Sequence, residues 1–171
     1  MKLSRSDCDI FIPNPEMSAG LTPEAALART THLCVIAHQD DIEINAYPAV
    51  AECYGRTDKF FTGVVMTNGA GSARTGKYGH VTDAQMQEIR KEEQRTAARL
   101  GKYNLQLQLS HPSGDVKKSG NAAVAADLAA IFGGCVASGR ANGALTARII
   151  HVPHDAIPVV LIPDVRFETS D

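Results

Sequence analysis

The sequence lacks several features that mark whole classes of protein. Its 171 residues contain no basic tract and carry a formal net charge of -2, so nothing indicates a nucleic-acid footprint. No apolar run reaches the length of a membrane span, and no signal-type apolar segment follows the charged residues near Met1. We therefore expect a protein with no membrane span and no nucleic-acid partner.

Cysteine is also scarce and irregularly placed. The four cysteines, at positions 8, 34, 53 and 135, form no Cys-x-x-Cys pair. This spacing argues against both a thiolate zinc site and a disulfide framework. A reducing compartment is the simplest setting for such a chain, and we expect it to be cytoplasmic.

The composition that remains is that of an ordinary globular protein. The hydrophobic fraction is 44% and the charged fraction 21%, with no internal repeat or low-complexity linker. Residues 1–171 are therefore expected to form a single domain. Apolar runs alternate with helical patterns along the chain, which predicts an α/β fold with a mainly parallel sheet and helices on both faces.

The individual elements are expected as follows. Buried strands are predicted at His32–Ala37 and Phe60–Thr67. The alternation of leucine with polar residues in Leu105–Leu109 predicts a half-exposed strand near a sheet edge. Helices are predicted at 23–29, 42–54 (interrupted near Pro48), 82–100 and 121–132, the last closed by Gly133–Gly134. Residues 1–30 form an N-terminal arm that is irregular up to Gly20, and residues 133–171 form a C-terminal segment of their own.

The most informative stretch follows the first predicted strand. The apolar run stops at His38, and Asp40, Asp41 and Glu43 follow at once. In open α/β sheets, ligands bind beyond the carboxyl ends of the strands. An imidazole with a carboxylate suits Zn²⁺ or another divalent ion. Because neighbouring side chains diverge, we expect one aspartate to bind the metal while the other acts as general base on water.

Taken singly, a histidine after a strand is commonly a surface residue, and an Asp-Asp pair is commonly a solvated turn. The complete string His-x-Asp-Asp-x-Glu after Val-Ile-Ala instead resembles the signature of the PIG-L/LmbE family of metal-dependent N-deacetylases. Three further segments resemble the same family, and the resemblance covers about residues 30 to 132. They are residues 64–72 (VVMTNGAGS), residues 89–101 (IRKEEQRTAARLG) and residues 111–113 (HPS). The match is closest to a branch with Gln after the first His.

The resemblance implies a Rossmann-like α/β fold and zinc-dependent hydrolysis of an N-acetyl group from an N-acetylglucosamine-type amino sugar or its conjugate. By resemblance, His38 and Asp41 are ligands of Zn²⁺ or another divalent metal, and Asp40 is the general base. The partner is then a small-molecule amino-sugar substrate. Relatives are often homo-oligomers, which would help to cover an edge strand.

Two further residues have two interpretations each. By resemblance, Arg90 borders the sugar pocket and binds a hydroxyl or phosphate group. Its alternative is a surface pair with Glu93 or Gln94 along the predicted helix. Asn68 is either a sugar contact or a turn residue, and the turn is the safer interpretation.

The C-terminal segment departs from the family. A zinc site of this kind needs a third protein ligand, which the family supplies from a later His-x-x-His element. Here His151 and His154 have that spacing, and the resemblance implies that His154 is the third ligand and His151 the group that assists the oxyanion. However, Pro153 and Pro158 forbid the helix that normally follows, so the alternative is two histidines in an extended surface segment.

Three functional hypotheses follow. The first is an active metal-dependent N-deacetylase. The second is a truncated or degenerate relative, or an interaction module, that keeps the fold without catalysis. The third is a nucleotide-binding domain based on Gly69 and Gly71, which is disfavoured because the stretch lacks a third glycine and a following helix.

Overall fold

The computed structural model describes residues 1–13, 20–136, 147–149 and 159–161 of the chain. The strands are β1 (Asp9–Phe11), β2 (His32–Ile36), β3 (Phe61–Thr67), β4 (Leu105–His111), β5 (Ala147–Ile149) and β6 (Val159–Leu161). The α-helices are α1 (Pro23–Ala28), α2 (Asp41–Asn45), α3 (Tyr47–Cys53), α4 (Asp83–Leu100), α5 (Ser113–Lys117) and α6 (Ala122–Val136). A short 3₁₀ helix, η2 (Gly76–Tyr78), precedes α4.

The strands form one sheet in the order β1-β4-β3-β2-β6-β5. The central strands β4, β3 and β2 are parallel, whereas β1 and β6 pair antiparallel with β4 and β2. The chain steps from β2 to β3 to β4 and then returns to β6 on the other side of β2. The carboxyl end of β2 therefore lies where the strand order reverses, which is the usual place for a ligand site in such sheets.

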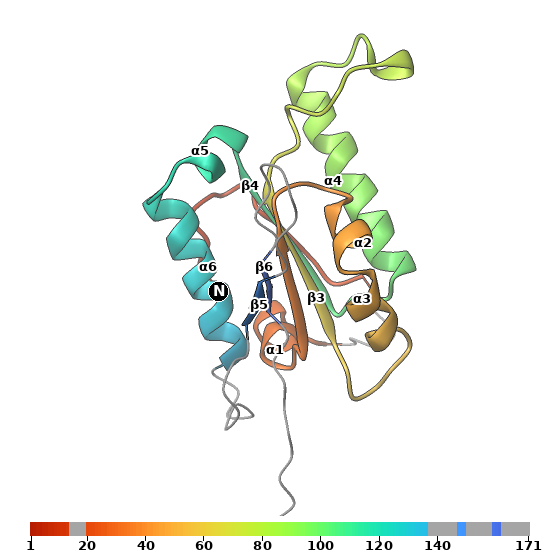
Figure 1. Cartoon of the computed structure of the whole chain (residues 1–171), viewed down its shortest axis with the longest axis vertical. Coiled ribbons are helices and arrows are strands. Elements are labelled where there is room, and N and C mark those ends of the chain that lie inside the picture. The colour runs from red at the N-terminus through yellow and green to blue at the C-terminus, as the bar shows by residue number, and fades with distance from the viewer. Residues whose placement is uncertain (14–19, 137–146, 150–158, 162–171) are drawn as a thin grey trace, which may run out of the picture.

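Helices cover both faces of this sheet (Figure 1). The side chains of β2 alternate between the two faces, so that Leu33 and Val35 pack in the core beside α1 and α6. Cys34 and Ile36 pack in the opposite core, beside α2, α3 and α4. The predicted Rossmann-like α/β fold with a mainly parallel sheet is confirmed.

The local signals at helix ends were predicted well. Thr82 caps α4 by accepting a hydrogen bond from the Gln85 backbone, and the Gln85 side chain accepts one in return from the Thr82 N–H. The expected interruption near Pro48 is also present, because the chain forms two short helices, α2 and α3, with Pro48 in the first turn of α3. No helix in the described part of the chain is long and apolar enough to span a membrane.

Two predictions about strands were wrong. Leu105–Leu109 is neither half-exposed nor at an edge, because β4 is buried along its whole length between β3 and β1. The glutamines Gln106 and Gln108 are buried as well, since they form hydrogen bonds beneath α4. The N-terminal arm is not wholly irregular either, because β1 adds an antiparallel strand to β4.

Two predictions about helices also needed correction. α6 does not end at Gly133–Gly134 but continues to Val136. A Cβ atom on Gly134 would lie 2.4 Å from Leu27 Cδ2, so this glycine allows α6 to approach α1 closely rather than stopping the helix. The spacing of apolar residues in 82–100 predicts that Leu100 shares the core face of this helix with Met86, Ile89 and Ala97. In the structure Leu100 is 74% exposed, and Ala98 lies in the core instead.

Candidate functional site

The loop from Ala37 to Asp40 connects β2 directly to α2 and lies at the carboxyl end of β2. The Ala37 carbonyl accepts a hydrogen bond from the Thr67 N–H at 2.9 Å, which ties the start of this loop to the end of β3. His38, Asp40 and Asp41 all line one cleft of about 680 Å³. The structure therefore brings the three residues of the sequence motif together at an opening to solvent.

His38 and Asp41 lie side by side. Asp41 Oδ2 is 3.3 Å from His38 Nδ1 and also accepts a hydrogen bond from the His38 backbone N–H at 3.3 Å. Their side chains are 44% and 24% exposed, so both remain accessible from the cleft. Two ligands of a tetrahedral zinc ion, with bonds of about 2.0–2.1 Å, lie about 3.3 Å apart. The spacing and chemistry of this pair therefore fit a divalent cation.

Asp40 forms its hydrogen bonds with α4. Its backbone has φ 71° and ψ -20°, a left-handed conformation that is uncommon outside glycine. Its Oδ2 accepts a hydrogen bond from Arg90 Nη2 at 2.8 Å, and its backbone N–H donates to Gln94 Oε1 at 3.1 Å. The carboxylate is 65% exposed, which leaves room for a second partner in the cleft.

Arg90 connects α4 to this loop. Its Nη2 also donates to the Gln39 carbonyl oxygen at 2.8 Å, and its Nη1 donates to Glu93. Burial disfavours the charged guanidinium, but hydrogen bonding and attraction to Asp40 outweigh this effect and raise the pKa of Arg90. The surface pair with Glu93 that the sequence offered is thus present, together with a bond to Asp40 that the sequence did not indicate.

Asn68 lies in a tight turn after β3. Its Oδ1 accepts a hydrogen bond from the Ala70 N–H at 3.1 Å, and its own N–H donates to the His111 carbonyl at 2.9 Å. Asn68 does not line the cleft that holds His38; it lines a smaller polar pocket of about 110 Å³ behind the loop. This geometry favours the turn interpretation of Asn68.

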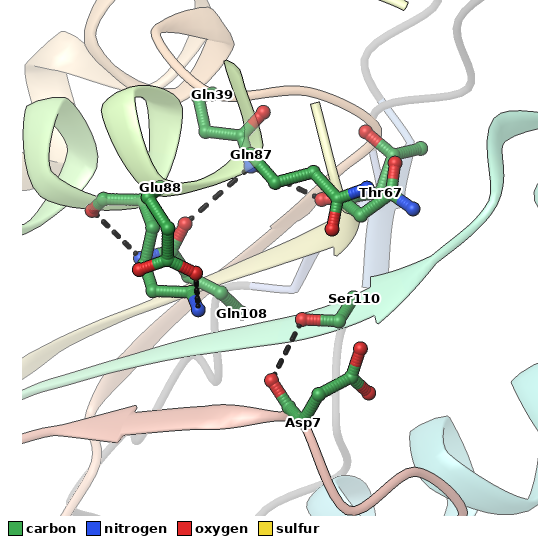
Figure 2. Close-up of a pocket in the computed structure, with 9 residues that line it drawn as sticks. Asp7, Gln39, Thr67, Gln87, Glu88, Gln108 and Ser110 are labelled. Carbon is green, nitrogen blue, oxygen red and sulfur yellow. Dashed lines mark hydrogen bonds and ion pairs between the residues drawn. The ribbon is translucent and has the colours of Figure 1, made fainter. Parts of the chain in front are cut away.

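The smaller pocket is shown in Figure 2, where Gln39 reaches across to the ends of β3 and β4. Gln39 Nε2 donates to the Thr67 carbonyl at 3.1 Å and to Gln108 Oε1 at 3.4 Å. Ser110 lines the same pocket, and its hydroxyl donates a hydrogen bond to the Asp7 carbonyl. The side chain of Gln39 thus braces the loop from within the protein.

The sequence analysis missed the buried polar residues that support the motif. Gln39 and Gln94 are 2% and 1% exposed. The position of Gln39 inside the motif was a visible signal, but nothing local marked Gln94. Gly69 was also missed as a support: a Cβ atom there would lie 2.8 Å from Arg90 Cβ and 2.9 Å from Gln39 Oε1.

The predicted residues His151 and His154 lie outside the described residues. Among the described residues, no group of three or more His, Cys, Asp and Glu side chains is arranged to hold a metal ion. The described part of the site therefore offers the two candidate ligands His38 and Asp41.

Comparison with known proteins gives one match. A sequence model of the family described as PIG-L: GlcNAc-PI de-N-acetylase matches residues 33–157, which is well over half of the chain and includes the motif after β2. Neither the curated proteins nor the solved structures contain a significant match. The extent of the family match shows that the chain belongs to the PIG-L family.

Proposed function

We propose that this protein is a metal-dependent N-deacetylase that hydrolyses the N-acetyl group of an N-acetylglucosamine-type amino sugar or its conjugate. The observation that carries the proposal is the arrangement of His38, Asp40 and Asp41 at the mouth of one cleft. The family description supports the same chemistry, since it names a de-N-acetylase that acts on an N-acetylglucosamine conjugate.

In this proposal His38 and Asp41 hold a divalent cation, with Zn²⁺ as the first candidate. When bound, such an ion supplies a Lewis acid that polarises the amide carbonyl and stabilises developing negative charge. His154 is proposed as the third ligand, and His151 as the group that assists the oxyanion. Both of these roles rest on the family resemblance and on the His-x-x-His spacing.

The chain's own groups then carry the proton transfers. Asp40 accepts a proton from the attacking water as the new C–O bond forms at the amide carbon. When the C–N bond breaks, the leaving amine takes up a proton from Asp40, so that the products are acetate and a free amino sugar. Arg90 holds one carboxylate oxygen of Asp40, which leaves the other oxygen free to face the water.

The wall of the cleft suits a sugar. Tyr78 and Ile89 provide apolar surface in the cleft, and Ser72 adds a hydroxyl. Sugar rings commonly pack an apolar face against such side chains while their hydroxyl groups bind polar ones. A contact between Arg90 and the substrate is part of the proposal, since Arg90 lines the cleft and its pairing with Asp40 occupies only part of its guanidinium. Asn68, the other predicted sugar contact, lines the smaller pocket, and its proposed role is that of a turn residue.

The test measures zinc binding and acetate release together. Titration of the metal-free protein with Zn²⁺ by calorimetry should give a site that is lost in His38→Ala and retained in His80→Ala, since His80 is an exposed loop histidine. Acetate release from N-acetylglucosamine glycosides should follow the same pattern. Equal zinc binding by the wild type and His38→Ala would contradict the proposal.

The second candidate is a family member that keeps the fold without catalysis. It is favoured by the departure of the C-terminal segment from the family pattern, because Pro153 and Pro158 forbid the helix that normally follows the His-x-x-His element. This alternative predicts no acetate release from a zinc-loaded protein with any N-acetylglucosamine glycoside tested.

A further inference from the structure

The buried face of α4 carries two polar side chains in line with two apolar ones. Met86, Arg90, Gln94 and Ala98 follow each other at intervals of four residues, which places them on one stripe of the helix. Met86 and Ala98 pack in the interior, as expected for such a stripe. Arg90 and Gln94 instead form hydrogen bonds with the same residue of the loop between β2 and α2, Asp40.

Both the oxygen and the nitrogen of the Gln94 side-chain amide form hydrogen bonds. Its Oε1 accepts the hydrogen bond from the Asp40 backbone N–H at 3.1 Å. Its Nε2 donates to Glu43 Oε1 at 3.1 Å and to Gln106 Oε1 at 3.4 Å. The residue is 1% exposed, so water cannot replace these partners.

Glu43 determines which way this amide faces. Glu43 Oε1 accepts hydrogen bonds both from the Gln94 NH₂ group and from the Tyr103 hydroxyl, the second at 2.7 Å. Rotating the Gln94 amide by half a turn would place its oxygen against Glu43 Oε1 and Gln106 Oε1, and its NH₂ group against the Asp40 N–H. Glu43 therefore fixes the Gln94 oxygen in the orientation that receives Asp40.

The hydrogen bond to Asp40 acts at a strained point of the backbone. Asp40 is held at φ 71°, and this left-handed conformation sets the direction in which its carboxylate leaves the loop. Without an acceptor for its N–H, the loop would relax toward the right-handed or extended conformations that most residues prefer.

We propose that Gln94, oriented by Glu43, is a positioning residue that holds Asp40 in the left-handed conformation required for its role as general base. The catalytic part of this inference rests on the proposed deacetylase function. The structural part, the hydrogen bond from Asp40 to Gln94, stands independently of it.

The first experiment measures hydrogen exchange of the Asp40 amide by NMR in the full-length protein. The wild-type amide should be protected, and Gln94→Met, which removes the acceptor at similar volume, should make exchange at least about tenfold faster. Gln87→Met on the same helix is the matched control and should leave the Asp40 amide protected. A rapidly exchanging Asp40 amide in the wild type would overturn the proposal, whether or not the variant folds.

The second experiment removes the orienting partner. Glu43→Met takes away one acceptor of the Gln94 NH₂ group and leaves the longer contact with Gln106 Oε1 at 3.4 Å. In this variant the Asp40 amide should exchange faster than in the wild type but more slowly than in Gln94→Met. Exchange as slow as in the wild type, in a folded protein, would refute the orienting role of Glu43.

The catalytic readout separates positioning from stability. Gln94→Met should lower kcat for acetate release from N-acetylglucosamine glycosides by about 10- to 100-fold, with little change in KM or zinc affinity. Glu43→Met should lower kcat by less than Gln94→Met does, and unchanged kcat in folded Gln94→Met would refute the positioning role. If the zinc-loaded wild type releases no acetate, the proposed function fails, whereas the exchange measurements still decide the structural part.

Discussion

Arg90 Nη2 lies 2.8 Å from Asp40 Oδ2 and 2.8 Å from the Gln39 carbonyl oxygen. One nitrogen of a residue on α4 thus binds both the side chain of the candidate general base and the backbone immediately before it. Arg90 is only 18% exposed, so the contact is held by its surroundings rather than by a mobile surface pair. The planar guanidinium suits this arrangement because its N–H groups point in fixed directions.

Replacing Arg90 with lysine tests this contact. The ammonium group of Arg90→Lys keeps the charge but loses the rigid fork, so we expect kcat for acetate release to fall about tenfold while zinc affinity is retained. Steady-state kinetics and zinc calorimetry measure the two effects. Arg99→Lys on the same helix, where Arg99 pairs with Glu92, serves as the control and should leave kcat unchanged. A higher KM with unchanged kcat would instead assign Arg90 to the substrate.

The part of the fold that could be predicted from the sequence depends on local signals. The strand before His38, the capping pair of Thr82 and Gln85 and the break near Pro48 are each specified within a few residues. The same holds for the grouping of His38, Asp40 and Asp41, because three residues directly after a buried strand cannot be far apart. Their catalytic and metal-binding roles remain predictions.

What could not be predicted depends on contacts between distant segments. Gln106 and Gln108 look solvent-facing beside their leucine neighbours, but they are buried because α4 and β1 cover β4. Gly134 looks like a helix stop until Leu27 is known to pack against it. Arg90 and Gln94 lie 50 and 54 residues after Asp40 in the sequence. No periodicity within α4 indicates their hydrogen bonds to it.

The two neighbouring aspartates are expected to respond differently to the same substitution. Asp40→Asn should lower kcat by about 10²- to 10⁴-fold, because an amide cannot accept the proton of water, while zinc affinity is retained. Asp41→Asn should weaken zinc binding itself, because the neutral amide replaces a candidate carboxylate ligand. Calorimetry and acetate release on both variants separate the roles, and loss of zinc binding in Asp40→Asn alone would reverse the assignment.

A buried cluster on the other face of the sheet should govern stability rather than activity. Asp127 accepts hydrogen bonds from the Ser4 backbone N–H at 2.6 Å, the Ser4 hydroxyl at 2.7 Å and His111 Nε2 at 2.8 Å. The side chains of His111 and Asp127 are 3% and 1% exposed. This cluster ties the N-terminus and α6 to the end of β4.

Asp127→Ala should lower the free energy of unfolding by about 2–4 kcal/mol, because it leaves a buried imidazole and the Ser4 groups without their acceptor. Urea unfolding followed by circular dichroism measures the loss. Asp58→Ala removes an exposed carboxylate that pairs with Arg56, and it should have no measurable effect. If Asp127→Ala is as stable as the wild type, the cluster makes no net contribution to the free energy of unfolding.

The environment of His32, at the start of β2, predicts that the stability of the protein depends on pH. Burial lowers the pKa of His32 below the ordinary histidine value of 6.5, and the nearby Glu52 offsets this only in part. Its Nδ1 lies 3.2 Å from Cys53 Sγ and 2.9 Å from Thr31 Oγ1, contacts that suit a neutral ring. The folded protein therefore binds this proton less readily than the unfolded chain does.

The stabilising contribution of neutral His32 is complete above the unfolded pKa of 6.5 and is lost as the pH falls toward the lower folded pKa. The wild type should thus lose more unfolding free energy than His32→Gln between about pH 7.5 and pH 5.5. His80→Gln, at an exposed histidine, should follow the wild type. If the wild type gains stability relative to His32→Gln on acidification, the ion pair with Glu52 outweighs burial, and folding raises the pKa of His32 instead of lowering it.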